Sequence, residues 1–288
     1  MSDYVIVADS ACDIEEPVLR EWGVRPVQLT YVFTDTEEQH NDYDLDPKDF
    51  YRMMREGRVA KTSAANIQQY LELFTEIYEE GKDILYIGFS TGLSTSYNAG
   101  CAACEQLKEQ YPDRKCMTVD SFAASAGYGL LVYLAVEKKK AGATLAENAA
   151  YVEETRLHVV HWFTVGDLQY LKRGGRINPA AAFVAGVLDI KPVLHVDNGG
   201  FLINMFKVRK RKNSIKAMAD KYAETALHPK EGPIFICQGD CMEDAEYLAS
   251  LLKEAHGVSV DKIVYTGTVI GAHSGPGTLA LFYLGTER

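Results

Sequence analysis

The sequence has no long apolar run and no export signal. Its first residues, MSDYVIVADS, contain no basic segment followed by an apolar core. No stretch reaches the roughly eighteen apolar residues that a bilayer-spanning helix needs. We therefore expect a cytoplasmic protein with at most transient membrane contact.

Basic side chains are scarce relative to acidic ones. Thirty Lys and Arg stand against forty Asp and Glu, which gives a formal net charge of −10. Because such a charge repels phosphate backbones at long range, nucleic-acid binding is not expected. The one dense basic run, at 207–212, is predicted to be a solvated face at the start of a helix.

Nucleotide-binding loops are also missing. The chain has no Walker lysine motif, and GxGxxG does not occur in nucleotide-binding form. ATP binding by this chain is therefore not expected.

Cysteines are few, six in 288 residues. Without an export signal they are expected to be reduced thiols, and we predict no structural disulfide. Cys101 and Cys104 fall inside an expected helix, and Cys237 ends an apolar strand. The cysteine pairs lack a matching set of histidines, so inert thiols are favoured over a metal site.

In the first half of the chain, short β-rich runs alternate with longer helical patterns. The runs are YVIVADS at 4–10, VQLTYVF at 27–33, ILYIGFS at 84–90 and CMTVDS at 116–121, and apolar residues recur at helical spacing in 66–80. This alternation predicts a parallel sheet flanked by helices.

The character of the chain changes at HVVHWFTV, 158–165. Beyond it we expect a helix near 179–188 and two strands, 191–196 and 201–208, joined by an Asp-Asn-Gly-Gly turn. Further strands and helices complete a mixed sheet. The sequence thus predicts a two-domain α/β protein, with an N-terminal domain at 1–157 and a second α/β domain at 158–288.

Small polar residues gather where the expected parallel strands end. Asp9 and Asp120 each end a strand, and the run STGLSTS at 90–96 has more hydroxyls than one helix cap requires. Ligands of open parallel sheets bind at the carboxyl ends of the strands, so these residues mark a candidate site. The alternative for Asp9 and Asp120 is a role as helix caps.

Two further segments are candidates for an anion site. Lys61-Thr62-Ser63 precedes a helix, where hydroxyls and free N–H groups can converge on an anion, while a plain Ser63 cap is the alternative. His273 stands in GTVIGAHSGPG, 267–277, which is predicted to be a turn. Surface hydrogen bonding is the alternative role for that histidine.

Seven motifs, in order and over nearly the whole chain, resemble the DegV family. They are VADSACDI (7–14), KTSAAN (61–66), FSTGLSTSYNAG (89–100), LKRGGRI (171–177), KPVL (191–194), the Arg209 segment and VIGAHSGPG (269–277). The resemblance implies a bacterial protein with a two-domain α/β fold and a fatty acid between the domains. It also implies the lipid-binding subunit of a fatty acid kinase, whose separate ATP-using subunit phosphorylates the bound carboxylate.

Carried onto this chain, the resemblance implies residues for the head group and for a basic surface. The carboxylate anchors would be Thr62, Ser94 and the backbone around Thr95, with His273 close by; Arg209 and Arg173 would lie at the head-group end or the partner surface. Thr95 replaces a frequent glycine, which bears on the backbone shape of the anchor. Ala64-Ala65 replaces a frequent Gln-Pro.

The resulting hypothesis is a non-catalytic protein that binds one long-chain fatty acid, of the palmitate or oleate type, and no cofactor. It would present the carboxylate to the kinase subunit. The apolar tunnel would supply most of the affinity, at roughly 0.8 kcal/mol for each buried CH₂, with 180–188 as a candidate wall. A serine-dependent hydrolase or acyl transferase using Ser94 or Ser90 with His273 is the alternative, and a ligand-free interaction module is a third possibility.

Overall fold

A parallel sheet forms the N-terminal part of the molecule. The computed structural model describes residues 3–177, 189–228, 232–286 and 288. Sheet A has four parallel strands in the order β2-β1-β6-β7, namely Val24–Val27, Tyr4–Asp9, Asp83–Gly88 and Cys116–Asp120. The parallel sheet predicted from the alternating pattern is therefore confirmed.

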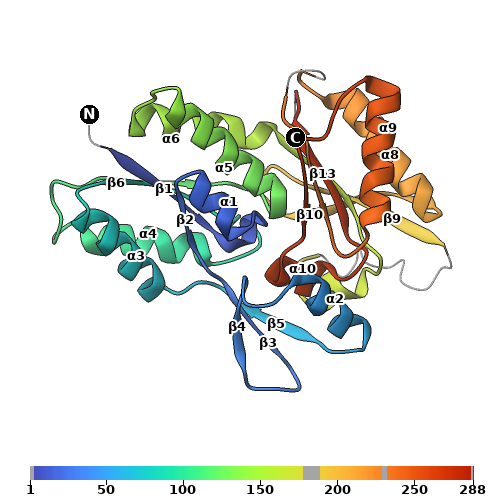
Figure 1. Ribbon diagram of the computed structural model, residues 1–288, viewed down its shortest axis with the longest axis horizontal. Coiled ribbons are helices and arrows are strands. Elements are labelled where there is room, and N and C mark those ends of the chain that lie inside the picture. The colour runs from blue at the N-terminus through green and yellow to red at the C-terminus, as the bar shows by residue number, and fades with distance from the viewer. Residues whose placement is uncertain (1–2, 178–188, 229–231, 287) are drawn as a thin grey trace.

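Helices cover both faces of sheet A. α3 (Ile67–Glu79) and α4 (Ser96–Leu107) lie on one side, and α5 (Ser125–Lys140) and α6 (Leu145–Thr155) lie on the other (Figure 1). Short helices α1 (Glu16–Glu21) and η1 (Ser10–Cys12) follow β1. Because both faces are covered, the two central strands β1 and β6 are buried along their whole length and carry nearly continuous apolar runs.

Sheet C is a mixed sheet in the second half of the chain. Its six strands run in the order β10-β9-β8-β13-β11-β12. Only β11 and β12 pair in parallel. The strands are Leu202–Arg209, Ile190–Val196, Val159–Thr164, Leu279–Leu284, Phe235–Gln238 and Lys262–Tyr265. The α/β fold with a mixed second sheet is therefore confirmed, as is the β9–β10 hairpin with its turn at 197–200.

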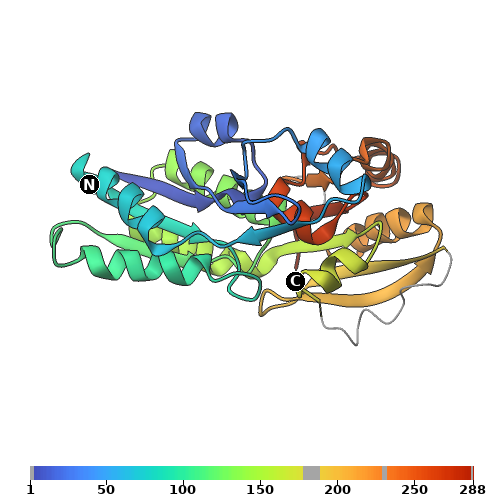
Figure 2. The ribbon, with the colours of Figure 1, turned by 90° about the horizontal axis from the view of Figure 1, so that it is seen from below.

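Helix α5 joins the two sheets, because it contacts β1 on one side and β8, β11 and β13 on the other. α8 (Arg211–Thr225) and α9 (Met242–His256) pack against sheet C, and η2 (Arg156–His158) leads into β8. Figure 2 shows the two sheets side by side along the long axis of a flattened molecule. The larger apolar core runs through both, from Val7 in β1 to Phe282 in β13. The domain boundary near residue 157 stays a prediction.

A third, antiparallel sheet was not expected. Sheet B has the order β4-β3-β5, with strands Gln39–Asn41, Thr30–Phe33 and Ala60–Ser63, and α2 (Pro47–Arg55) lies between β4 and β5 in sequence. The prediction of one strand over 27–33 was wrong, because the Leu29 N–H donates to Ser10 Oγ at 3.0 Å and β3 then joins another sheet. The Ser63 cap was also wrong, since Ser63 ends β5 and Asn66 caps α3.

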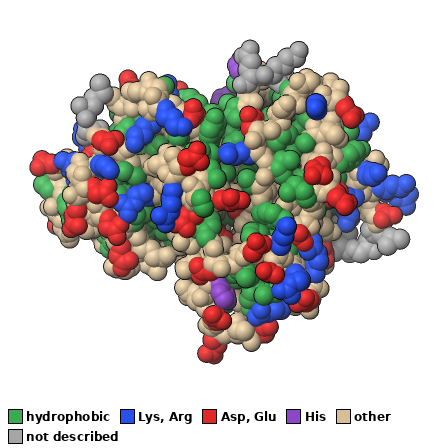
Figure 3. All heavy atoms as spheres, viewed as in Figure 1, with side chains coloured by type: hydrophobic (Ala, Val, Ile, Leu, Met, Phe, Trp, Pro, Cys, Tyr) green, Lys and Arg blue, Asp and Glu red, His purple; other side chains and the backbone are tan. Residues whose placement is uncertain are grey.

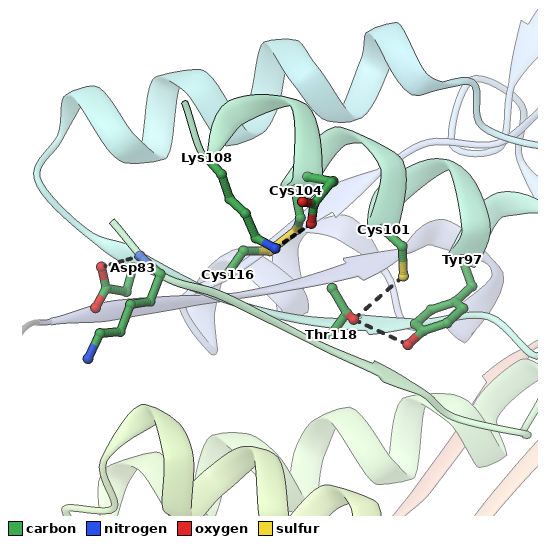
Figure 4. Close-up of a disulfide and its surroundings, with 9 residues drawn as sticks. Asp83, Tyr97, Cys101, Cys104, Lys108, Cys116 and Thr118 are labelled. Carbon is green, nitrogen blue, oxygen red and sulfur yellow. Dashed lines mark hydrogen bonds and ion pairs between the residues drawn. A yellow bond between two sulfur atoms is a disulfide. The ribbon is translucent and has the colours of Figure 1, made fainter. Parts of the chain in front are cut away.

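A disulfide joins Cys104 in α4 to Cys116 at the start of β7, with 5.9 Å between their Cα atoms (Figure 4). The prediction of no disulfide was therefore wrong. It rested on cellular redox conditions, which say nothing about which side chains the fold brings together. Cys101 lies in α4 and Cys237 is buried in β11, as predicted, and both are free thiols.

Acidic and basic side chains are mixed over most of the face shown in Figure 3. In the basic run, Lys207, Arg209, Lys210 and Lys212 are exposed, as predicted for a solvated face, whereas Arg211 is half-buried and pairs with Asp244 at 2.9 Å. Across the described ranges, no helix is long and apolar enough to cross a membrane. The helix expected near 179–188, with its candidate tunnel wall, lies outside those ranges.

Candidate functional site

A cavity of about 890 Å³ lies between the carboxyl ends of the sheet A strands and sheet C. Segments after β6 and β7, around Phe89 and Ala124, line one side, and Phe163, Ala280 and Phe282 of sheet C line the other. Its volume is within the range of small-molecule sites in proteins. The ends of the parallel strands therefore open onto a cavity, at the place where the sequence analysis looked for a site.

The predicted head-group residues all line this cavity. Thr62 comes from β5, Ser94 and Thr95 from the segment between β6 and α4, and His273 from α10 (Thr268–Ser274). Thr62 Oγ1 lies 2.7 Å from His273 Nε2, a hydrogen bond across 211 positions of sequence. His273 stands on a helix, so its predicted position in a turn was wrong.

His273 is held in its neutral form. Burial, the largest cause, and the nearby positive charges of Arg176 and Arg173 together lower its pKa to about 4. Its Nδ1 is buried and has no hydrogen-bond partner among the described residues. That atom faces Gly174 so closely that a Cβ there would clash with it. At neutral pH, His273 therefore acts as a dipole with one donor and one acceptor and not as a cation.

Ser94 and Thr95 form the entry to helix α4. Ser94 Oγ accepts the Ser96 N–H at 3.2 Å and lies 2.9 Å from Ser96 Oγ, which in turn accepts the Ala65 N–H at 3.2 Å. Thr95 is the N-cap residue, but its exposed side chain does not cap the helix. The Ser96 N–H is therefore already bonded, and Ser94 and Thr95 bring the N-terminal end of α4, the positive end of the helix dipole, to the cavity.

Arg176 is a cavity residue that sequence reasoning missed. Its Nε donates to Leu93 O at 3.2 Å and its Nη1 to Gly174 O at 2.6 Å, which ties the segment after α7 (Gln169–Arg173) to the Ser94 segment. Burial lowers its pKa below the usual range, although it stays charged. Its position directly after the two glycines of LKRGGRI was the available signal.

The two arginines that the sequence analysis named lie outside the cavity wall. Arg173 is exposed at the end of α7 and stacks over the Tyr170 ring, 4.9 Å from its centroid. Its charge still reaches His273. Arg209 is exposed at the end of β10 and is not among the described residues that line the cavity. The structure therefore brings Thr62, Ser94, Thr95 and His273 together, with Arg173 close and Arg209 apart.

The rest of the cavity is largely apolar. Leu29, Phe89, Val269, Ile270 and Phe282 are among its lining residues. His161, which also lines it, is neutral, because burial lowers its pKa well below the usual value. Both of its ring nitrogens have partners, Ala124 N–H at 3.3 Å and Val159 O at 2.9 Å. Such a surface suits a hydrocarbon chain, and apart from Arg176 the described residues that line it carry no charge.

Asp9 lies behind the cavity wall and holds the Phe89 segment in place. Its buried carboxylate accepts the Phe89 N–H at 2.7 Å and the hydroxyls of Tyr70 and Tyr86. Burial raises its pKa to about 6, against the opposing effect of these hydrogen bonds. Asp120 likewise accepts the N–H groups of Thr91 and Phe122. Neither caps a helix through its side chain, so the capping alternative was wrong for both; they position the segments that line the cavity.

A serine nucleophile is not in place here. The partner of His273 Nε2 is Thr62, whereas Ser94 Oγ is bonded to Ser96 and buried Ser90 Oγ donates to Gly200 O at 3.0 Å. A catalytic histidine also needs a group that orients its second nitrogen. In the described part of the chain, nothing bonds to His273 Nδ1. The geometry favours binding of an anion over acyl transfer.

Comparison with known protein families gives a match over almost the entire chain. A family model described as "Uncharacterised protein, DegV family" matches residues 3–286. A DegV domain-containing protein of Clostridium perfringens is 42% identical over 289 residues, covering 100% of this chain and 99% of the relative. Another, of Streptococcus pyogenes, is 31% identical and covers 98% of each chain.

Solved structures of the same fold contain lipids or are described as binding them. A DegV lipid-binding protein of Thermotoga maritima is 28% identical, with a TM-score of 0.86 over 99% of both chains. A fatty-acid-binding DegV family protein of Thermus thermophilus is 27% identical, with a TM-score of 0.87 over 99% of this chain and 100% of the other. A stearic-acid-binding protein of Eubacterium ventriosum is 25% identical, with a TM-score of 0.87 over 98% of each. On its sequence and its fold, the chain belongs to the DegV family.

Proposed function

We propose that this protein binds one long-chain fatty acid, of the palmitate or oleate type, in the cavity between its two sheets. The observation that carries the proposal is the composition of the cavity wall, which is largely apolar and also contains the hydroxyls of Thr62 and Ser94, His273 and the charged Arg176. A fatty acid likewise has an apolar tail and a charged carboxylate. The solved relatives that bind fatty acids support the assignment.

The tail supplies most of the binding free energy in this proposal. Each CH₂ moved from water into an apolar wall contributes about 0.8 kcal/mol, so a chain of about sixteen carbons outweighs a few head-group hydrogen bonds. The head group therefore fixes the orientation of the lipid more than its affinity. It keeps the carboxylate at a defined end of the cavity.

The carboxylate would be held by Thr62, Ser94, the N–H groups around Thr95 and His273, with Arg176 supplying positive charge. Since His273 is neutral, it contributes a hydrogen bond and not an ion pair. Arg176 lines the cavity and is oriented by two backbone carbonyls. Hydrogen bonds to a charged group are about twice as strong as neutral ones, which favours the ionised fatty acid.

We further propose that the protein is a non-catalytic, cytoplasmic subunit that presents the carboxylate to an ATP-dependent fatty acid kinase. Its two domains, 1–157 and 158–288, would enclose the lipid. Exposed Arg173 and Arg209 would belong to the surface that meets the kinase, since both are charged and free of the cavity wall. Arg209→Ala should slow acyl phosphate formation by the kinase and ATP without changing lipid occupancy; an unchanged rate would remove Arg209 from that surface.

Native mass spectrometry of freshly purified protein tests the lipid proposal, followed by extraction and identification of any bound molecule. We expect one fatty acid per chain. Arg176→Gln should lower occupancy by palmitate, whereas Arg20→Gln, which removes the same charge from the exposed face of α1, should not. A protein that is empty and also takes up neither palmitate nor oleate would overturn the proposal.

A further inference from the structure

One face of helix α4 is attached to β7 by side chains spaced along both elements. Tyr97, Cys101 and Cys104 recur at helical spacing, so they lie on the same side of α4. Their partners, Thr118 and Cys116, are two residues apart in a strand and so share one face of β7. Figure 4 shows these side chains between the helix and the strand.

The contacts along this face differ in strength. Tyr97 Oη donates to Thr118 Oγ1 at 3.2 Å, and Cys101 Sγ lies 3.5 Å from the same oxygen. Near the other end of the helix, Cys104 and Cys116 form the disulfide. The covalent bond is thus the strongest attachment of α4 to β7, and it closes the loop that carries the chain from one to the other.

The two sulfur atoms differ in their access to solvent. Cys104 is buried, with 6% of its surface exposed, whereas Cys116 is only half-buried at the start of the strand. Thiol–disulfide exchange needs a thiolate to reach one sulfur while the other leaves. Cys116 is therefore the accessible sulfur and Cys104 the leaving group.

The opposite end of α4 belongs to the lipid site. The helix begins at Ser96, next to Ser94 and Thr95, and Ser96 Oγ accepts the Ala65 N–H. Cys104 is eight positions after Ser96, about 12 Å along a helix. A bond that fixes the end of α4 near Cys104 therefore restrains the rigid element from which the head-group wall extends.

We propose that the Cys104–Cys116 disulfide is a redox-reversible clamp that sets how firmly α4 and the head-group wall are held on sheet A. A low-molecular-weight thiol attacks Cys116 Sγ, forming a mixed disulfide and releasing Cys104 as a thiol. A second such thiol attacks the sulfur of the first, which releases Cys116 as a thiol and leaves the oxidised disulfide of the reductant. The reverse sequence, with that disulfide as oxidant, restores the clamp.

Counting thiols tests whether the bond exists and reverses. Protein treated with oxidised glutathione and then alkylated in denaturant should show four reactive cysteines of the six in the chain, and six after reduction with dithiothreitol. Peptide mapping without reductant should identify Cys104 joined to Cys116. Six reactive thiols in the oxidised sample, or a different pair, would overturn the proposal.

Thermal melting and lipid release test the consequence of the clamp. Reduction should lower the melting temperature of the wild-type protein by roughly 5 °C or more, as expected for opening a loop of this length. It should also speed release of cis-parinaric acid, a fluorescent fatty acid, at least about twofold. Cys101→Ser should keep both responses, and Cys104→Ser/Cys116→Ser should lose both.

The release measurement rests on the proposed function, whereas thiol counts and melting do not. A protein that binds no fatty acid but shows the expected thiol counts and melting shift would refute the lipid proposal and keep the clamp itself. Equal melting temperatures before and after reduction would refute the clamp. A melting shift with unchanged lipid release would refute its link to the head-group wall.

Discussion

Thr62 Oγ1 and His273 Nε2 are hydrogen-bonded at 2.7 Å, although β5 of sheet B carries one and α10 the other. The bond fixes the ring of a histidine whose other nitrogen is buried without a partner among the described residues. It also holds the Thr62 hydroxyl at the cavity, where a carboxylate would meet it.

Replacing Thr62 by valine should weaken palmitate binding about ten- to hundredfold, because a hydrogen bond to a charged group contributes about 1.5–3 kcal/mol. Valine keeps the shape of the side chain and removes only the hydroxyl. Thr62→Ser, which keeps the hydroxyl, is the matched control and should bind close to the wild type. Titration with a fluorescent fatty acid measures both; equal affinities for Thr62→Val and the wild type would contradict the assignment.

The free energy of unfolding should fall as the pH is lowered from about 6.5 to 4, in part because of His273. Its pKa is about 4 in the folded protein, below the ordinary value of 6.5, so the unfolded chain binds more protons in this window. His273→Gln should reduce the pH dependence, measured by urea unfolding at several pH values. His161 and His195, whose pKa values are also lowered, remain in both proteins, so identical slopes would argue against a buried neutral His273.

Gly174→Ala should weaken fatty acid binding by displacing His273. Gly174 has a φ of −72°, which alanine adopts freely, but the added Cβ would clash with His273 Nδ1. The ring must then move away from Thr62. In a His273→Ala background, the same change should cost no further affinity. Full additivity of the two changes would show that Gly174 acts through something other than the histidine.

Asp9→Ala should lower the free energy of unfolding by at least about 2 kcal/mol, because the buried Phe89 N–H and the hydroxyls of Tyr70 and Tyr86 lose their acceptor. Asp9→Asn keeps an acceptor and should cost less. Denaturant unfolding at pH 7.5 compares the two variants. If alanine and asparagine are equally stable, the carboxylate does not hold the Phe89 segment.

The same residue gives a pH dependence of opposite sign to that of His273. Asp9 has a pKa of about 6 when folded, above the ordinary 3.8, so the native state binds more protons between these values. Its contribution to the free energy of unfolding therefore falls as the pH rises from about 4 to 6 and is constant above. Asp9→Asn should remove this component; a curve unchanged by the substitution would show that Asp9 titrates as an ordinary carboxyl.

The sequence predicted features that depend on neighbours along the chain. The β-rich runs became the parallel strands β1, β6 and β7, and Asp197–Gly200 became the turn between β9 and β10. The ordered motifs identified the family. Thr62, Ser94 and His273 were named from those motifs, and they do line one cavity.

The predictions that were wrong concern residues whose structure depends on contacts with segments distant in sequence. The run 27–33 reads as one strand, but a hydrogen bond from Leu29 to Ser10 breaks it and sends its second half into sheet B. His273 was expected in a glycine-rich turn and stands on α10. The sequence did not identify Arg176 as a cavity residue, because the carbonyls of Leu93 and Gly174 orient its side chain and Leu93 is distant in sequence.

By itself, then, the sequence determined the α/β alternation, the family and the residue types of the head group, since these follow from local periodicity and motif order. Only the tertiary structure decided which strand joins which sheet, which cysteines meet and which arginine faces the cavity. The physical reason is that the side chains of a strand or helix repeat their direction every few residues, so the pattern can be read locally. Which strands pair, and in which register, depends on packing between segments far apart in sequence. The Cys104–Cys116 bond and the Thr62–His273 bond both belong to this second class.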